Sequence, residues 1–345
     1  RMLIMKAVGY TSSLPISHCD ALKDIELDKP APSGRDVLVK ISAIAVNPVD
    51  YKIRQRVSPE KGTSKVLGWD AVGEIVAVGS EVQQFNVGDR VFYAGDLTRQ
   101  GSNAEYQLVD ERIVGNAPSS LSDSDAAALP LTTITAWELV FEHLAIKKQP
   151  VGKVEKTDDL VLVVGAAGGV GSVMLQLLKQ LTGATVIATA SRDSSKAWVE
   201  RLGADYVVDH SQPLSAQIKG LGLGEVTHVA SLNNTDSYID TYVDVMKPMG
   251  KIALIDDPES LDVKKLKQKS ISLHWEFMFT RAMFATADMQ EQGRLLTEMA
   301  SLIDKGCINT TVGKHLGKIN AENLMAAHRE LESGTAIGKI VLEGF

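Results

Sequence analysis

Short runs of alternating apolar and polar residues fill the first third of the chain and predict β-strands separated by turns. The predicted strands cover residues 6–10, 37–46, 73–78, 90–93 and 105–109. Glycine, proline, asparagine and aspartate cluster between them, as expected at turns. Short strands at this spacing indicate an antiparallel, barrel-like domain.

The middle of the chain alternates apolar strand patterns with amphipathic helix patterns. Residues 160–165 form a continuous apolar run, which is typical of a strand buried on both faces, and a helix pattern follows over 170–181. Further strands are predicted at 184–190, 206–209, 226–231, 251–255 and 271–277, and helices at 195–202, 214–220 and 237–246. This alternation predicts an α/β fold built on a doubly wound parallel sheet.

The end of the chain carries helix patterns at 289–305 and 321–331 and a last strand pattern at 339–342. Because the parallel sheet should be complete by about residue 277, the simplest interpretation returns this tail to the first domain. We therefore predict one domain from residues 1–129 and 281–345, and a second domain, residues 130–280, inserted into it.

Charge and cysteine content narrow the possible partners and location. The net charge is −7 and no lysine or arginine cluster offsets it, which argues against nucleic-acid and anionic-membrane binding. The two cysteines, Cys19 and Cys307, form no disulfide framework, which favours a reducing compartment. The first six residues do not resemble a signal peptide, and glycines interrupt the longest apolar run at 160–178. The sequence therefore predicts a soluble, cytoplasmic protein.

A glycine-rich segment, G-A-A-G-G-V-G at 165–171, follows the first buried strand and opens a helix. In the dinucleotide-binding register, Gly168 lets the backbone approach a pyrophosphate and Gly171 lets the helix pack closely on the sheet. The helix N-terminus adds N–H donors and a positive dipole end. Because the segment lies between a strand and a helix, it predicts a dinucleotide site. The residues assigned to the cofactor here are Ala166, Gly168, Gly169, Val170 and Gly171.

The end of the second strand of this domain predicts which dinucleotide binds. NAD-specific domains usually place an acidic residue there, whereas this chain has Ser191 and Arg192, followed by Lys196. A hydroxyl and two cations favour a 2′-phosphate, and arginine matches phosphate geometry. We therefore predict NADPH. Two alternatives remain: Asp193 takes the acidic position, or the two cations are ordinary surface residues.

Several motifs resemble the medium-chain dehydrogenase/reductase family and span nearly the whole chain in the family's order. They are N-P-V-D at 47–50, G-W-D-A-V-G at 68–73, V-G-D-R-V at 87–91, L-P-L-T-T at 129–133 and G-K-I-V-L at 338–342. The resemblance implies a GroES-like β-barrel catalytic domain, a Rossmann domain, and a homodimer formed through the edge strand near 271–277. The segment 272–281 resembles a subfamily often labelled zinc-type alcohol dehydrogenase-like.

The same resemblance locates the positions where the family's alcohol dehydrogenases hold zinc. Those positions correspond here to Asn47, to Trp69 and Asp70, and to Thr132 and Thr133. Zinc requires three or four converging N, S or O ligands, which these side chains do not supply, and no group of four cysteines exists. We therefore expect no metal. The pairs His18–Cys19 and His274–Glu276 are interpreted as structural.

By resemblance, Asn47 and Tyr51 lie near the nicotinamide, where either side chain can stabilise charge on a carbonyl oxygen. Thr133 and Lys339 are assigned to the cofactor, although Thr133 could instead cap a helix. Arg54 either assists or is a surface cation. The expected activity is NADPH-dependent reduction of a small quinone or α,β-unsaturated carbonyl (enone) in the zinc-free quinone oxidoreductase branch. The alternatives are a zinc alcohol dehydrogenase, an enoyl reductase acting on thioesters, and a non-catalytic NADPH-binding sensor.

Overall fold

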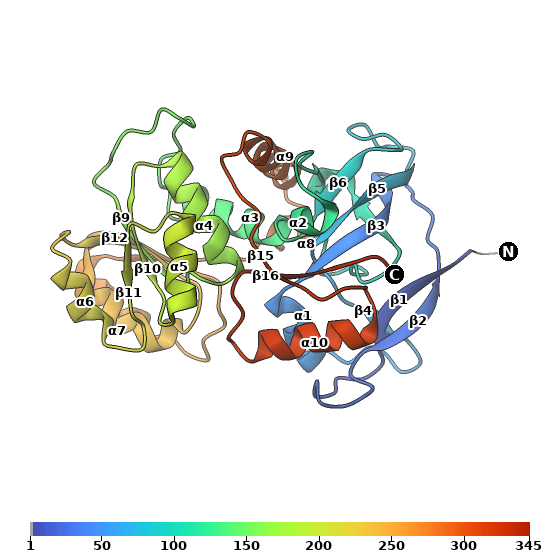
Figure 1. The fold of residues 1–345 in the computed structure, drawn as a ribbon, viewed down its shortest axis with the longest axis horizontal. Helices are drawn as coiled ribbons and strands as arrows, with labels where there is room; N and C mark the ends of the chain where they lie inside the picture. The colour runs from blue at the N-terminus through green and yellow to red at the C-terminus, as the bar shows by residue number, and fades with distance from the viewer. Residues whose placement is uncertain (1–2) are drawn as a thin grey trace. The chain divides into compact units, whose positions relative to one another are not determined.

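The computed structural model describes residues 3–345 and separates into two units (Figure 1). One unit contains residues up to Ile134 together with Phe279–Phe345, and the other contains Thr135–Met278. The limits predicted from sequence differ from these by a few residues and remain a prediction of the domain boundaries. Arg1 and Met2, at the start where no signal peptide is expected, lie outside the described residues.

The first unit is built on two sheets whose strands are mostly antiparallel. The smaller sheet has the order β2-β1-β4, with β1 (Ile4–Tyr10), β2 (Lys23–Asp28) and β4 (Lys65–Val66). The larger sheet has the order β15-β16-β3-β5-β6-β8, and β7 pairs with β3. Its strands are β3 (Asp36–Val46), β5 (Ala71–Val78), β6 (Arg90–Tyr93), β7 (Tyr106–Asp110), β8 (Gly115–Asn116), β15 (Val312–His315) and β16 (Lys339–Glu343). Because β16 pairs with β3, the tail completes the N-terminal sheet, which confirms its expected return.

Helices of the first unit accompany these sheets, and α1 and α3 carry residues predicted for the site. They are α1 (Pro48–Arg56), α2 (Asp123–Ala127), α8 (Thr280–Met283), α9 (Glu291–Asp304) and α10 (Ala321–Glu332), while α3 (Pro130–Trp137) runs across the division between the units. The start of α1 follows from its sequence. Pro48 occupies the first turn, where its missing N–H costs no hydrogen bond, and the Asp50 carboxylate accepts the Asn47 N–H at 2.8 Å.

A buried cluster joins α1 to α10. Arg54 has no exposed surface; its Nε donates to Nδ1 of His328 at 3.1 Å, and its guanidinium also pairs with Glu332. The interpretation of Arg54 as a surface cation is therefore wrong. Burial, reinforced by the neighbouring guanidinium, lowers the pKa of His328 to about 3, so this imidazole is neutral in the folded protein.

The neutral state of His328 makes the stability of this protein depend on pH. Below pH 6.5 the unfolded chain protonates this histidine while the folded chain does not, so its contribution falls as pH drops from 6.5 towards 3. We compare the wild type with His328→Asn, which keeps an acceptor for Arg54 but cannot titrate. The unfolding free energy of the wild type relative to this variant should fall by on the order of 1.4 kcal/mol per pH unit.

Urea unfolding of both proteins at pH 7, 6 and 5 measures this difference. The pKa of Asp50, raised to about 7 by burial, changes stability in the opposite direction, because it favours folding at lower pH. Asp50 is present in both proteins, so its contribution cancels in the comparison. A difference between the two proteins that stays constant over these pH values would contradict a neutral, buried His328.

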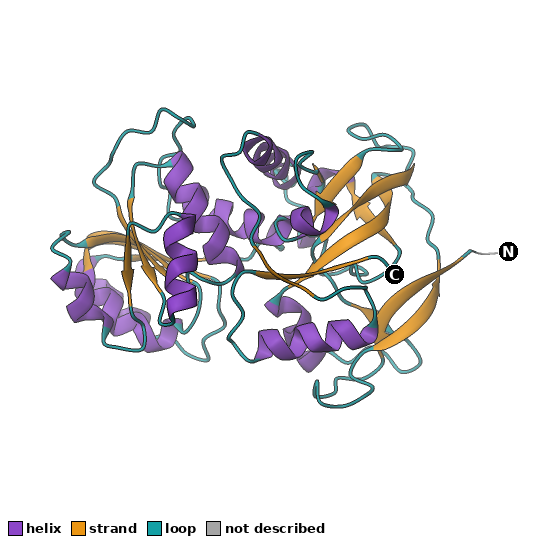
Figure 2. Ribbon diagram, viewed as in Figure 1, coloured by secondary structure: helices purple, strands orange, loops and turns teal. Residues whose placement is uncertain are grey.

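The second unit confirms the doubly wound parallel sheet. The strand order is β11-β10-β9-β12-β13-β14, and every pair is parallel. The strands are β9 (Leu160–Val164), β10 (Thr185–Thr189), β11 (Tyr206–Val208), β12 (Val226–Ser231), β13 (Met246–Leu254) and β14 (Ser272–Trp275). The order reverses between β9 and β12. Helices α4 (Gly169–Leu181) and α5 (Asp193–Leu202) therefore cover one face, and α6 (Leu214–Gly220) and α7 (Thr235–Val245) the other (Figure 2).

Strand β14 forms one edge of this sheet and leaves apolar surface open. Trp275, at its end, is 53% exposed, and Phe277 just beyond it is also exposed. A free, apolar strand edge is suited to pairing with another chain. The homodimer expected through this edge remains a prediction.

None of the helices formed by residues 3–345 combines the length and hydropathy needed to span a membrane.

Candidate functional site

The glycine-rich loop makes a tight turn between β9 and α4. Gly165 adopts a left-handed conformation (φ +81°), and its N–H donates to the Thr189 hydroxyl at 3.1 Å, which ties the loop to the end of β10. A Cβ on Gly171 would lie 2.4 Å from the carbonyl oxygen of Ala166, so only glycine allows α4 to start this close to the loop. The first-turn N–H groups of a helix lack intrahelical acceptors and are available to an anion.

The predicted phosphate-binding residues follow β10 directly. Ser191 is half-buried, Arg192 is exposed immediately before α5, and Lys196 lies one turn further on. Asp193 is the first residue of α5, so it does not occupy the strand end where an NAD-specific acid would lie. The Lys196 ammonium is 3.8 Å from the carboxylate of Asp209, whose pKa is lowered by hydrogen bonds from Ser211. A phosphate would therefore share Lys196 with this carboxylate.

In the first unit, three buried polar side chains form a closed hydrogen-bonded triangle: Asn47, Asp70 and Lys339. The amide Nδ2 of Asn47 donates to Oδ2 of Asp70 at 2.8 Å, and Nζ of Lys339 donates to the same oxygen at 3.0 Å. Nζ of Lys339 also donates to Oδ1 of Asn47. The three side chains are at most 4% exposed. The sequence identifies Asn47 and Lys339 as site residues and gives Asp70 no role. The signal for Asp70 is its position, because a carboxylate between Trp69 and the apolar strand β5 is unusual.

Within this triangle, the ammonium of Lys339 lies beside the carboxyl group of Asp70. Burial raises the pKa of Asp70, and the ammonium of Lys339 opposes that rise. A lysine has three N–H donors, and Lys339 uses them on Asp70, Asn47 and the carbonyl oxygen of Val46 at 3.1 Å. Lys339 therefore acts here as an internal counter-ion. Its assignment to the cofactor stays a prediction.

Tyr51 and Thr133 lie on the two helices that begin beside the triangle. Tyr51 is half-buried in α1, one residue after Asp50. Thr133 lies inside α3, so the alternative that it caps a helix is wrong. The Thr133 hydroxyl is buried and has no hydrogen-bond partner among residues 3–345. A buried polar atom without a partner calls for an explanation, and a bound ligand supplies one.

The side chains at the family's zinc positions do not fit a zinc ion. The amide of Asn47 is already bonded to Lys339 and Asp70, and the indole of Trp69 offers only an N–H donor. A dication would also have to sit beside the buried ammonium of Lys339, which is electrostatically unfavourable. His18, Cys19 and Asp20 do bring ligand atoms within 4.8 Å of one another, but all three are exposed residues of a loop. In the other pair considered, Glu276 bonds His143 at 2.6 Å instead of His274.

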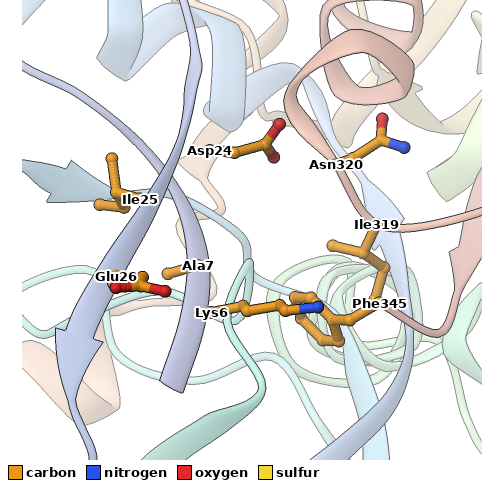
Figure 3. Close-up of a pocket in the computed structure, with 8 residues that line it drawn as sticks. All are labelled: Lys6, Ala7, Asp24, Ile25, Glu26, Ile319, Asn320 and Phe345. Carbon is orange, nitrogen blue, oxygen red and sulfur yellow. The ribbon is translucent and has the colours of Figure 1, made fainter. Parts of the chain in front are cut away.

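A separate hollow in the first unit contains none of the predicted site residues. It measures about 520 Å³ and lies between the β1–β2 hairpin and the start of α10 (Figure 3). One of its lining carboxylates, Asp24, accepts the N–H of Ala321 at 2.9 Å and so stabilises the first turn of α10. This carboxylate therefore has a structural role.

Comparisons with known proteins agree with this architecture. Residues 33–119 match the family described as "Alcohol dehydrogenase GroES-like domain", and residues 202–342 match "Zinc-binding dehydrogenase". A "Zinc-type alcohol dehydrogenase-like protein" from Staphylococcus aureus (strain Mu50) is 40% identical over 339 residues, covering 98% of this chain and 99% of that protein. A "2-methylene-furan-3-one reductase" from Solanum lycopersicum is 36% identical over 222 residues, covering 60% of this chain and 53% of that protein.

Solved structures of related proteins have the same fold. The crystal structure of a Rhizobium etli CFN 42 protein assigned to the zinc-dependent alcohol dehydrogenases is 50% identical, with a TM-score of 0.96, covering 100% of this chain and 99% of that one. The quinone oxidoreductase from Coxiella burnetii is 26% identical, with a TM-score of 0.80, covering 99% of each chain.

Proposed function

Because the chain belongs to the medium-chain dehydrogenase/reductase family, with its GroES-like barrel and Rossmann domain, we propose that it reduces a quinone or an α,β-unsaturated carbonyl with NADPH and without zinc. One observation carries this proposal: Asn47 and Asp70, which stand at two of the family's zinc positions, bond each other and the buried ammonium of Lys339. An oxidoreductase of this fold without a metal needs an acceptor that takes hydride readily, and quinones and enones do.

Two relatives support this substrate class. The tomato reductase is named for a methylene-furanone, which is an enone, and the Coxiella protein is named as a quinone oxidoreductase. The names of other relatives include the word zinc, but such a name is a statement about those proteins and not about this chain. We further propose that the protein is a cytoplasmic homodimer.

In the proposed reaction, one set of residues binds NADPH and another set stabilises charge on the substrate. The α4 N-terminus, with Gly168 and Gly171, binds the pyrophosphate, and Arg192 binds the 2′-phosphate. When bound, NADPH supplies the hydride. The Thr133 hydroxyl orients the cofactor, and the N–H of Asn47 or O–H of Tyr51 stabilises negative charge that develops on the carbonyl oxygen.

Arg192→Ala should weaken NADPH binding by roughly tenfold or more, because one charge-assisted phosphate contact is worth about 1.5–3 kcal/mol. NADH lacks the 2′-phosphate, so its affinity should barely change. Arg201→Ala, at the far end of the same helix, is the matched control and should leave both affinities unchanged. Fluorescence titration of the wild type and both variants with each cofactor measures the six dissociation constants. Equal wild-type affinities for NADPH and NADH would refute the assignment of NADPH.

Turnover of NADPH against a panel of acceptors tests the proposed function. We expect oxidation of NADPH with quinones or enones. Reaction with simple alcohols that depends on zinc would favour an alcohol dehydrogenase, and reaction confined to unsaturated thioesters would favour an enoyl reductase. NADPH binding with no turnover of any acceptor would favour the sensor.

A further inference from the structure

The Asp70 carboxylate joins three segments of the first unit that lie far apart in the sequence. Its Oδ2 accepts from Asn47, the residue before α1, at 2.8 Å and from Lys339 of β16 at 3.0 Å. Its Oδ1 accepts the backbone N–H of Leu131, in the first turn of α3, at 2.7 Å. The helices α1 and α3 carry Tyr51 and Thr133. One buried carboxylate thus reaches both helices on which the predicted site residues lie.

From this geometry we propose that Asp70, paired with the buried ammonium of Lys339, is a positioning residue that sets the orientation of Asn47 and the start of α3. This inference rests on the proposed function, because it assigns Asp70 a role in that reaction. Asp70 is not proposed to touch substrate or cofactor; it acts through Asn47 and α3.

The donors and acceptors allow only one orientation of the Asn47 amide. Lysine can only donate, so the amide oxygen must face Lys339, and the amide nitrogen then faces Oδ2 of Asp70. The amide nitrogen has two N–H groups, and Asp70 takes one of them. The second N–H is therefore the one through which Asn47 can reach a carbonyl oxygen, and its direction is fixed by the contact with Asp70.

Replacing Asp70 by asparagine breaks this arrangement for a specific reason. Three donors converge on Asp70, from Asn47, Lys339 and Leu131, on two different oxygens. An asparagine has one acceptor oxygen and one NH2 group, so it cannot accept on both sides. Either Asn47 and Lys339 or the start of α3 must lose a hydrogen bond in Asp70→Asn.

Two further variants separate positioning from folding. Glu111→Gln is the matched control, because Glu111 is also fully buried in the first unit and accepts from Arg35 at 2.8 Å and from two backbone N–H groups. If Asp70→Asn does not fold, Asp70→Asn combined with Lys339→Met removes both charges. Replacing a buried ion pair by neutral groups is often tolerated, whereas removing one partner is not.

We expect Asp70→Asn, or the double variant, to lower kcat by about 10- to 100-fold, as a small misplacement of site groups does. The Kd of Asp70→Asn for NADPH should stay within about threefold of the wild type, because the dinucleotide loop belongs to the other unit. Glu111→Gln should lose stability and keep kcat. If the Asp70 variants lose stability and keep kcat, Asp70 is merely structural and the proposal is overturned.

A crystal structure of the Asp70 variant tests the positioning role without any turnover. We expect the Asn47 amide to rotate or the Leu131 N–H to lose its partner. An unchanged Asn47 and an unchanged first turn of α3 would overturn the proposal even if the protein reduces quinones. A wild type that reduces no acceptor would refute the proposed function alone, and the crystal structure would still decide whether Asp70 orients these groups.

Discussion

Gly171→Ala should weaken NADPH binding by about 100-fold or more, since losing two charge-assisted phosphate contacts of about 1.5–3 kcal/mol each has this effect. The added Cβ would lie 2.4 Å from the carbonyl oxygen of Ala166 and 2.6 Å from its Cα. These are backbone atoms, so the loop or the start of α4 has to move, and the N–H groups that face the pyrophosphate move with it.

A second glycine of the same unit supplies the control. Gly220 is the last residue of α6. Apart from its chain neighbours and the backbone of its own helix, no heavy atom lies within 4 Å of the position where a Cβ would be added. Gly220→Ala should keep full NADPH affinity, with equal or slightly higher stability. Calorimetric titration of both variants with NADPH makes the comparison. If Gly171→Ala binds NADPH as tightly as Gly220→Ala does, the glycine-rich loop is not the dinucleotide site.

Asn47→Ala should lower kcat by about 100- to 1000-fold in a preorganised, dry site, which is the typical cost of losing one donor aimed at a developing oxyanion. The effect should be smaller with a quinone in a wide, wet pocket. Tyr51→Phe should have the smaller effect of the two, since a quinone accepts hydride readily. Both variants should still bind NADPH, because the loop at 165–171 is unchanged.

Gln107→Ala is the matched control for Asn47→Ala. Gln107 is another buried amide of the first unit, bonded to the Tyr93 hydroxyl at 2.9 Å and to the Gln100 carbonyl at 2.8 Å. Its loss should reduce stability without a comparable loss of kcat. Steady-state kinetics with one quinone and one enone measure the three variants. Full activity of Asn47→Ala on both acceptors would show that the carbonyl is polarised elsewhere or by solvent.

The second unit could be predicted closely because its signals are local. The helix at 214–220 and the strand at 226–231 have the predicted limits, since periodic apolar patterns and flanking turns define them. The local pattern does not predict strand β2, because its six residues, K-D-I-E-L-D, carry four charges. It is a strand because it pairs with β1 over six positions, which a local pattern does not reveal.

The first-unit site could be predicted only in part because its contacts are long-range. Asp70 and Lys339 are 269 positions apart, and Arg54 and His328 are 274 positions apart. A side chain's charge alone does not tell whether it will be buried beside a counter-ion. The sequence therefore leaves Arg54 as either a site residue or a surface cation, and it gives Asp70 no role. Asn47 and Lys339, which lie in two motifs at opposite ends of the chain, are in contact.

Deuteride transfer from NADPH labelled at the reactive C4 position tests the central claim most directly. The protein is purified without a metal-binding tag, its zinc content is determined by elemental analysis, and the product of a cyclic enone is analysed by mass spectrometry. Our account predicts far less than one zinc per chain and one deuterium on the carbon β to the carbonyl, at a rate that a chelator does not change. One tightly bound zinc per chain, lost together with the deuteride transfer when the chelator is added, would contradict it.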